Sequence, residues 1–104
     1  MQVVRPASLF GFNSHNKVMW WYVYLIQHNV TKQVYIGLTK NLQKRLTDHN
    51  QGKTKATYRR DGKWVLIYAE AYRNKKDAKR REKRLKHYGS AKQELFKRIK
   101  KCFI

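Results

Sequence analysis

The chain has 104 residues, enough for one domain with a single core and too few for a second domain. It carries 25 Lys and Arg against 6 Asp and Glu, a formal net charge of +19. An excess this large implies a polyanionic partner, either nucleic acid or an anionic membrane surface. No stretch approaches the ~18 consecutive apolar residues of a membrane-spanning helix. Aromatic residues are interleaved with the basic ones, which favours nucleic acid, because bases stack on rings while phosphates contact Lys and Arg. The alternative is that the basic run is simply a solvated helix face.

The cysteine content and the first 18 residues indicate the cellular compartment in which the protein is expected. Cys102 is the single cysteine, so it cannot form an internal disulfide, and no Cys/His cluster has zinc spacing. A reducing compartment, the cytoplasm, is expected. Residues 1–18 lack a charged segment followed by a sustained apolar run, so they do not resemble a secretory signal. We expect 1–18 to be a poorly ordered leader and 19–104 to be the folded domain.

The first predicted elements form a hairpin and a helix. Trp20 to His28 is rich in aromatic and β-branched residues and predicts a strand, and Gln33 to Leu38 predicts a second one. A short polar link joins them, which is typical of an antiparallel hairpin. Thr39 or Asn41 can then cap a helix that runs to about Asn50.

A basic, glycine-containing loop precedes the remaining elements. Trp64 to Tyr72 predicts a third strand, and a second helix is predicted from Asn74 or Lys75 to His87, with Gly89 as its stop. Ser90 would cap a third helix running to about Lys100. Strands with interspersed helices at this length predict an α+β domain, a small sheet with helices on its faces.

Arg45 and His49 lie four residues apart on the first predicted helix, so both project from one stripe. Leu42 and Leu46 form the adjacent apolar stripe that would dock on the sheet. The pair is therefore expected at the margin of the buried face, where a cleft would open. The alternative is an ordinary exposed arginine and histidine.

Glu82 is an acid in a basic helix. Ala78, Glu82 and Leu85 share one helix face, so the carboxylate falls on the apolar stripe. An acid at such a position is costly unless it is paired or binds a cation. Two interpretations remain, a salt bridge to a neighbouring Arg or a site for Mg²⁺, which proteins often hold with only one or two carboxylates.

Tyr24 and Tyr35 lie on the two strands of the predicted hairpin. Each could be a strand aromatic that fills the core. A buried tyrosine usually needs a partner for its hydroxyl, and two such hydroxyls near an arginine and a carboxylate could activate water. Composition alone leaves both interpretations open.

These residues fall in a recognisable order. Val23-Tyr24-Leu25, then Tyr35-Ile36-Gly37, then the helical Arg45 and His49 and the later helical Glu82 resemble the signature of the GIY-YIG nucleases. The resemblance covers about residues 20–95 and is strongest to short stand-alone bacterial members. The first motif differs from Gly-Ile-Tyr but keeps a tyrosine.

The resemblance implies a three-stranded antiparallel sheet flanked by helices. It also implies roles by matched position: Tyr24 and Tyr35 position or deprotonate the attacking water, Arg45 contacts the scissile phosphate, His49 assists proton transfer, and Glu82 holds the single metal ion, Mg²⁺ or Mn²⁺. Gly37, which has no Cβ, would permit a close approach near the site. The function implied is a metal-dependent endonuclease, with DNA favoured over RNA and DNA repair as the expected setting.

Basic residues on the loop and the helices are expected to contact backbone phosphates without recognising bases. They are Lys44, Lys53, Lys55, Arg59, Arg60, Lys79, Arg80 and Lys83. Two alternative functions remain open. A non-catalytic nucleic-acid-binding module explains the charge equally well, and a membrane-surface protein would use an amphipathic third helix.

Overall fold

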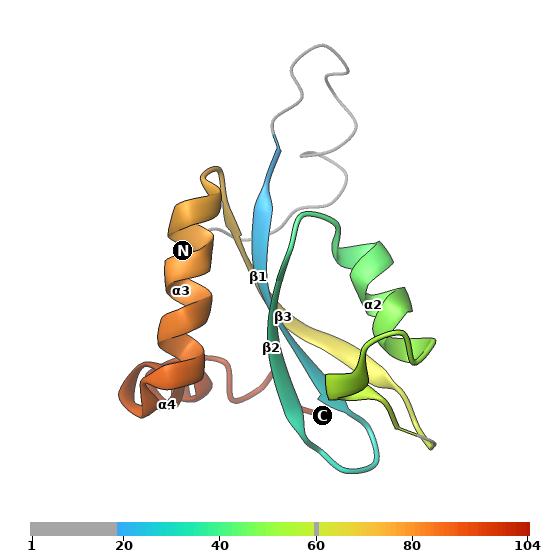
Figure 1. The fold of residues 1–104 in the computed structure, drawn as a ribbon. Helices are drawn as coiled ribbons and strands as arrows, with labels where there is room; N and C mark the ends of the chain where they lie inside the picture. Colours follow the sequence, from blue (N-terminus) through green and yellow to red (C-terminus); the bar gives the residue numbers. More distant parts are fainter. Residues whose placement is uncertain (1–18, 60) are drawn as a thin grey trace.

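A three-stranded antiparallel sheet forms the centre of the fold (Figure 1). The computed structural model describes residues 19–59 and 61–104, so the expected leader over 1–18 and the residue Arg60 lie outside the described residues. The strands are β1 (Trp21–His28), β2 (Val34–Thr39) and β3 (Trp64–Tyr72), in the spatial order β2-β1-β3. The predicted hairpin is confirmed, because β1 pairs with β2 antiparallel.

Three α-helices accompany the sheet within the described residues: α2 (Leu42–Asn50), α3 (Lys75–His87) and α4 (Gly89–Arg98). A short 3₁₀ turn, η1 (Lys55–Thr57), lies in the basic loop between α2 and β3. In Figure 1, α2 and α3 lie on either side of the sheet. The predicted α+β class is therefore confirmed.

Two asparagines begin the first two helices. The side chain of Asn41 accepts a hydrogen bond from Lys44 N at 3.1 Å, so the cap of α2 is Asn41 rather than Thr39. Asn74 accepts from Lys76 N at 2.8 Å and caps α3 in the same way. Gly52, with φ of +73°, follows α2 in the left-handed conformation that glycine adopts at helix ends.

The helix α3 ends at His87 as predicted, but the predicted roles of Gly89 and Ser90 were wrong. Tyr88 ends α3, because its N–H donates to Arg84 O at 2.9 Å, and it also begins α4, because its carbonyl accepts from Ala91 N at 3.1 Å. One residue thus belongs to both helix ends. Gly89 is the first residue of α4 instead of a stop, and Ser90 lies inside the first turn instead of capping it.

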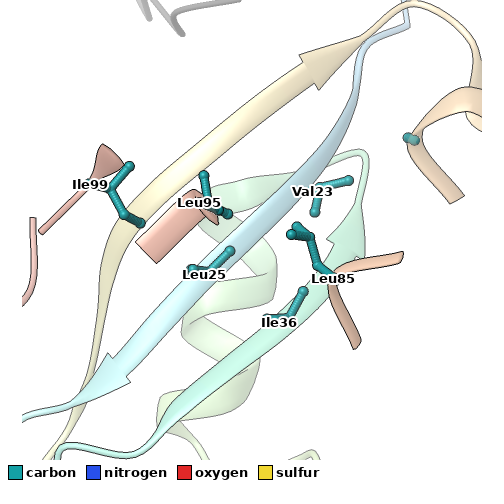
Figure 2. Close-up of a cluster of buried hydrophobic side chains, with 7 residues drawn as sticks. Val23, Leu25, Ile36, Leu85, Leu95 and Ile99 are labelled. Carbon is teal, nitrogen blue, oxygen red and sulfur yellow. The ribbon is translucent and has the colours of Figure 1, made fainter. Parts of the chain in front are cut away.

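The central strand is buried on both of its faces, which explains its nearly continuous apolar sequence. Val23 and Leu25 face α3 and α4, where they meet Leu85 and Leu95 (Figure 2). The alternate residues of β1 face the other way and pack against α2. These are Tyr24 and Ile26, which contact Trp64, Leu42 and Leu46.

Since neighbouring strand residues point to opposite faces, α2 and α3 cover opposite sides of the sheet. Tyr24 therefore belongs to the α2 side, whereas α3 carries Glu82 on the other side. No helix among the described residues is both long enough and apolar enough to cross a bilayer.

Candidate active site

The side chain of Tyr24 lies over a glycine of the neighbouring strand. It pairs with Gly37 across β1 and β2. A Cβ placed on Gly37 would overlap Cζ and Oη of Tyr24 and would lie only 2.7 Å from Cε1. The tyrosine ring therefore occupies the space that any other residue at position 37 would fill, and its hydroxyl extends over β2. The predicted close approach at Gly37 is confirmed.

The hydroxyl of Tyr24 contacts two side chains of α2. It lies 2.8 Å from Nε2 of His49, and Nε of Arg45 donates to it at 3.4 Å. Leu42 and Leu46 hold the helix on the sheet, as their spacing predicted. His49 is only 2% exposed, so the alternative of an ordinary exposed histidine is wrong, while Arg45 is half-buried.

The second ring nitrogen of His49 is also engaged. Its Nδ1 lies 2.6 Å from the hydroxyl oxygen of Thr57, a residue of η1 that is fully buried. The oxygen of that hydroxyl is 3.4 Å from Thr54 O. A chain of polar groups thus runs from Arg45 through Tyr24 and His49 into the loop.

Tyr35 lies beside this chain on the edge strand β2. Its ring centroid is 6.4 Å from that of Tyr24 and 5.1 Å from that of His49. The ammonium of Lys86, from α3, lies 5.5 Å from the Tyr35 ring centroid. Tyr35 is half-buried and therefore connects the α2 side of the sheet to α3 around the edge of the sheet.

Glu82 joins the cluster indirectly. Its carboxylate is 3.3 Å from Nζ of Lys86, the same ammonium that lies over Tyr35. The Glu82 side chain is 19% exposed. The expected alternative, an ion pair with a neighbouring arginine, was wrong in its partner. Arg81 points to Glu70 instead, and the lysine one helical turn further along is the neighbour of Glu82 on the helix surface.

The sequence is similar to those of known proteins. The family of the GIY-YIG catalytic domain matches residues 20–100. The chain belongs to the GIY-YIG family. A UPF0213 protein of Desulfotalea psychrophila is 34% identical over 85 residues, covering 80% of this chain and 76% of that protein. A UPF0213 protein of Bacillus velezensis is 39% identical over 85 residues, covering 81% and 78%.

Among solved structures, the solution NMR structure of a UPF0213 protein from Bacillus halodurans is similar, with a TM-score of 0.47 and 29% identity, covering 75% of this chain and 82% of that one. The predicted resemblance to GIY-YIG nucleases, and to their short stand-alone bacterial members, is confirmed. Membership indicates an endonuclease-type hydrolase with a nucleic-acid substrate, in a family that generally depends on a divalent metal ion.

The environment of the Tyr24, His49 and Arg45 cluster sets the protonation of its side chains. Burial raises the pKa of Tyr24 to about 12, although the hydrogen bond from Arg45 opposes that rise. Burial lowers the pKa of His49, and the positive charge of Arg45 lowers it further. At neutral pH the site therefore contains a neutral tyrosine, a neutral histidine and a charged guanidinium. A neutral histidine can accept a proton from the tyrosine, which the charged form cannot do.

The donor set for a metal ion is small. No group of three or more His, Cys, Asp or Glu in the described part of the chain could hold a metal. Glu82 supplies one partly exposed carboxylate. That donor set suits Mg²⁺, which is often bound by one or two carboxylates and takes its remaining ligands from water and substrate phosphate. Zinc, which is usually held by several nitrogen or sulfur ligands, does not suit it.

A buried ion pair fixes the helix that carries Glu82. Arg81 donates to both oxygens of Glu70 on β3, with Nη2 3.0 Å from Oε2. The hydroxyls of Tyr68 and Tyr72 donate to the same carboxylate at 2.7 and 2.6 Å. Burial alone would raise the pKa of Glu70, but these hydrogen bonds outweigh it and the pKa lies below its usual range. The network ties α3 to β3 at the residue that precedes Glu82.

The predicted phosphate-binding residues do not form one patch. Lys44, Lys53 and Lys55 are exposed around α2 and η1, and the first two pair with Asp48 at 3.3 and 3.7 Å. Arg59 hydrogen-bonds to Gln33 and Tyr58 O, and its guanidinium lies 6.0 Å from the Trp64 ring centroid. The remaining described members are exposed on α3, across the sheet: Lys79, Arg80 and Lys83. Arg60 lies outside the described residues.

Sequence reasoning missed two contributors to the site. Lys86 could have been found, because an acid and a lysine four residues apart on a helix are surface neighbours. Thr57 could not, because it lies in a loop whose path the sequence does not reveal. Two grooves of the described surface lie elsewhere on the molecule. They lie along α4 and are lined by residues such as Lys92, Phe96 and Arg98.

Proposed function

We propose that this GIY-YIG protein is an endonuclease that hydrolyses phosphodiester bonds in DNA with one divalent ion, Mg²⁺ or Mn²⁺. The observation that carries the proposal is the Tyr24 hydroxyl, held between a guanidinium and a neutral imidazole. A phenol, an acceptor for its proton and a fixed positive charge are the parts needed to deprotonate water beside a phosphate. Tyr24, Tyr35, Arg45, His49 and Glu82 are the proposed catalytic residues.

Tyr24 is the group we assign to water activation. With a pKa of about 12 it holds its proton at neutral pH, so it can act as a base only when that proton leaves. Nε2 of His49, 2.8 Å away, accepts the proton. As the water oxygen bonds to phosphorus, the water gives one proton to the Tyr24 oxygen and the tyrosine gives its own to His49. The P–O3′ bond breaks, and the departing oxygen takes a proton from solvent.

Arg45 is proposed to contact both the Tyr24 oxygen and the scissile phosphate. Its Nε–H donates to the Tyr24 oxygen, where it stabilises negative charge while the proton is in transit. The remaining N–H groups of the half-buried guanidinium are left to contact the scissile phosphate. Removing a donor of this kind from a developing charge costs about 10²- to 10³-fold in rate.

Glu82 is the residue we propose to hold the ion. When bound, a divalent ion withdraws electron density from the phosphoryl oxygens and stabilises charge on the departing oxygen. Lys86 shares the Glu82 carboxylate and lies over Tyr35, so its side chain would have to move as an ion binds. Tyr35, half-buried beside His49, is proposed to position the water from the β2 edge.

The basic residues of the two groups, around α2 and on α3, are proposed to hold the substrate backbone. Such contacts release counterions, so binding should weaken steeply as salt is added. DNA is the substrate we propose first, with recognition by shape rather than by sequence, and DNA repair as its setting. The exposed free Cys102 fits a reducing compartment, for which we propose the cytoplasm.

The test is a cleavage panel. Purified protein is incubated with branched, single-stranded and duplex DNA and RNA, with Mg²⁺, Mn²⁺ or EDTA. Glu82→Ala and Arg45→Ala are compared with matched controls, Glu94→Ala and Arg73→Ala, which remove exposed residues of the same charge. We expect metal-dependent cutting by wild type and both controls, at least 100-fold reduced in the site variants. Equal products from wild type and Glu82→Ala would overturn the proposal.

A non-catalytic nucleic-acid-binding module remains the second candidate, favoured by the net charge of +19. It predicts no cleavage on any substrate, no metal binding, and binding that Glu82→Ala leaves unchanged or tighter. Fluorescence anisotropy with a labelled oligonucleotide in EDTA measures that binding directly. Metal titration of the same protein separates the two candidates.

A further inference from the structure

Thr57 is a loop residue that is buried and hydrogen-bonded through both its side chain and its backbone. Its side chain is fully buried, and its hydroxyl oxygen lies 2.6 Å from Nδ1 of His49. Its carbonyl accepts a hydrogen bond from Nε1 of Trp64 at 2.7 Å. Asn50, the last residue of α2, in turn fixes the backbone of Trp64 by two hydrogen bonds of 2.8 and 3.1 Å. The loop is thus tied to the end of the helix that carries His49.

The hydrogen positions follow from donors and acceptors. Arg45 can only donate, so the Tyr24 oxygen accepts from it, and the hydroxyl hydrogen of Tyr24 is directed to Nε2 of His49. At the other end, the one hydroxyl hydrogen of Thr57 is directed to Thr54 O, so its oxygen accepts from Nδ1–H of His49. Each group in the chain then donates to the next one, from Arg45 through Tyr24, His49 and Thr57 to Thr54 O.

The opposite tautomer satisfies fewer groups. With the proton on Nε2, His49 would donate to the Tyr24 oxygen, which already accepts from Arg45. The Tyr24 hydrogen would then lose His49 as its acceptor, and Thr57 would have to turn its own hydrogen from Thr54 O towards Nδ1. A buried polar hydrogen without a partner costs about 1–3 kcal/mol.

We propose that Thr57 is a positioning residue that keeps the proton of neutral His49 on Nδ1 and leaves Nε2 as the acceptor for the Tyr24 proton. The inference rests on the proposed function for its catalytic meaning. In a free imidazole either nitrogen can carry the proton, and the hydrogen bond made by one nitrogen decides the state of the other. A histidine in the wrong tautomer has no lone pair facing Tyr24 and cannot relay its proton.

The direct test is the tautomer of His49 in the metal-free protein without substrate. Long-range ¹H–¹⁵N correlation spectra of uniformly labelled protein distinguish the two ring nitrogens, and His49→Gln assigns the signal. We expect wild type to be protonated at Nδ1 and unprotonated at Nε2. A wild-type spectrum with the proton on Nε2 would overturn the inference without any variant at position 57.

Two variants then test the role of the hydroxyl. Thr57→Val keeps the shape of the side chain but removes the acceptor, and we expect it to move the His49 proton towards Nε2. Thr57→Ser restores the hydroxyl and should restore the wild-type spectrum. An unchanged spectrum in folded Thr57→Val would show that Thr57 does not set the tautomer.

Cleavage supplies the second readout. Thr57→Val should lower kcat about 10- to 100-fold with little change in KM, which is part of the roughly 10²- to 10⁴-fold that a positioned proton acceptor contributes. Thr57→Ser should recover most of the loss. Equal losses in both variants, with the tautomer unchanged, would indicate a purely structural role. Because the spectra need neither substrate nor metal, they stand even if wild type cuts nothing, an outcome that would overturn the proposed function alone.

Discussion

The ring of Tyr24 lies across the backbone of Gly37, in the space that a Cβ at position 37 would occupy. That contact explains why a glycine follows Tyr35 and Ile36 on an edge strand, where a glycine otherwise weakens pairing. It also directs the Tyr24 hydroxyl over β2, towards Arg45 and His49. The glycine of the second motif, Gly37, thus leaves space for the tyrosine of the first motif, Tyr24.

Gly37→Ala should therefore impair cleavage more than folding. The new methyl group would overlap the buried Tyr24 ring, which must move by a substantial part of an ångström. A misplacement of about 1 Å can cost about 100-fold in rate, and we expect a loss of that order in kcat. Gly89→Ala is the matched control, because a Cβ there meets nothing within 4 Å. Full activity in Gly37→Ala would show that the Tyr24 position is not critical.

Cleavage should depend on the protonation of His49. Its pKa lies below the usual value of about 6.5, so the neutral form that accepts the Tyr24 proton dominates at neutral pH. As the pH falls through that lowered pKa, the imidazole gains a proton and can no longer act as acceptor. We expect log kcat to fall with a slope of one on the acid side and to level off above about pH 6.5.

His49→Gln provides the comparison for that profile. The variant should be slow throughout and should lose this acid limb, because the titrating acceptor is absent. If the limb persists unchanged in His49→Gln, another group controls the profile. Binding in EDTA over the same pH range checks that the limb does not reflect loss of substrate.

Lys86→Met should strengthen metal binding slightly. The Lys86 ammonium is 3.3 Å from the Glu82 carboxylate that we propose as the ion ligand. A partly exposed helix pair of this kind contributes about 0.3–0.5 kcal/mol, so its removal should tighten Mn²⁺ binding about twofold. Electron paramagnetic resonance of free Mn²⁺ measures the affinity without any cleavage. Lys83→Met, which removes an exposed lysine of the same helix, is the control. Equal effects of the two variants would indicate that the loss of a positive charge anywhere on the helix tightens Mn²⁺ binding, and not the loss of the ion pair with Glu82.

Glu70→Gln should destabilise the fold, because it leaves Arg81 without its buried partner. Breaking such a pair costs about 3 kcal/mol in the free energy of unfolding, measurable by denaturant titration. The exposed Glu94→Gln should cost almost nothing.

The same network predicts a pH dependence. The pKa of Glu70 is lowered in the folded state, so its contribution is fully present above the unfolded pKa of about 4.3. It is lost as the pH falls through the lower, folded pKa. Between pH 7 and pH 3, wild type should lose more stability than Glu70→Gln. Parallel pH curves for the two proteins would show that Glu70 is not the titrating group.

Local patterns in the sequence determined the strands, the helices and their caps to within a few residues. Asn41 and Asn74 carry their capping chemistry in a short side chain that needs only its own backbone neighbours. The junction at Tyr88 was mispredicted for the converse reason. Gly89 and Ser90 have capping chemistry, but packing of α3 and α4 on one apolar cluster joins the two helices through a single residue.

For the candidate site, too, the sequence determined one part and the tertiary structure another. The order of Tyr24, Tyr35, Arg45, His49 and Glu82 along the chain determined the family, because a motif needs only spacing. The tertiary structure alone decided that Thr57 contacts His49 and that Lys86 stands between Glu82 and Tyr35. These contacts join a loop to a helix and a helix to the far side of a sheet. The packing of the loop and the helices on the sheet determines which side chains meet. The spacing of residues along the sequence does not contain that information.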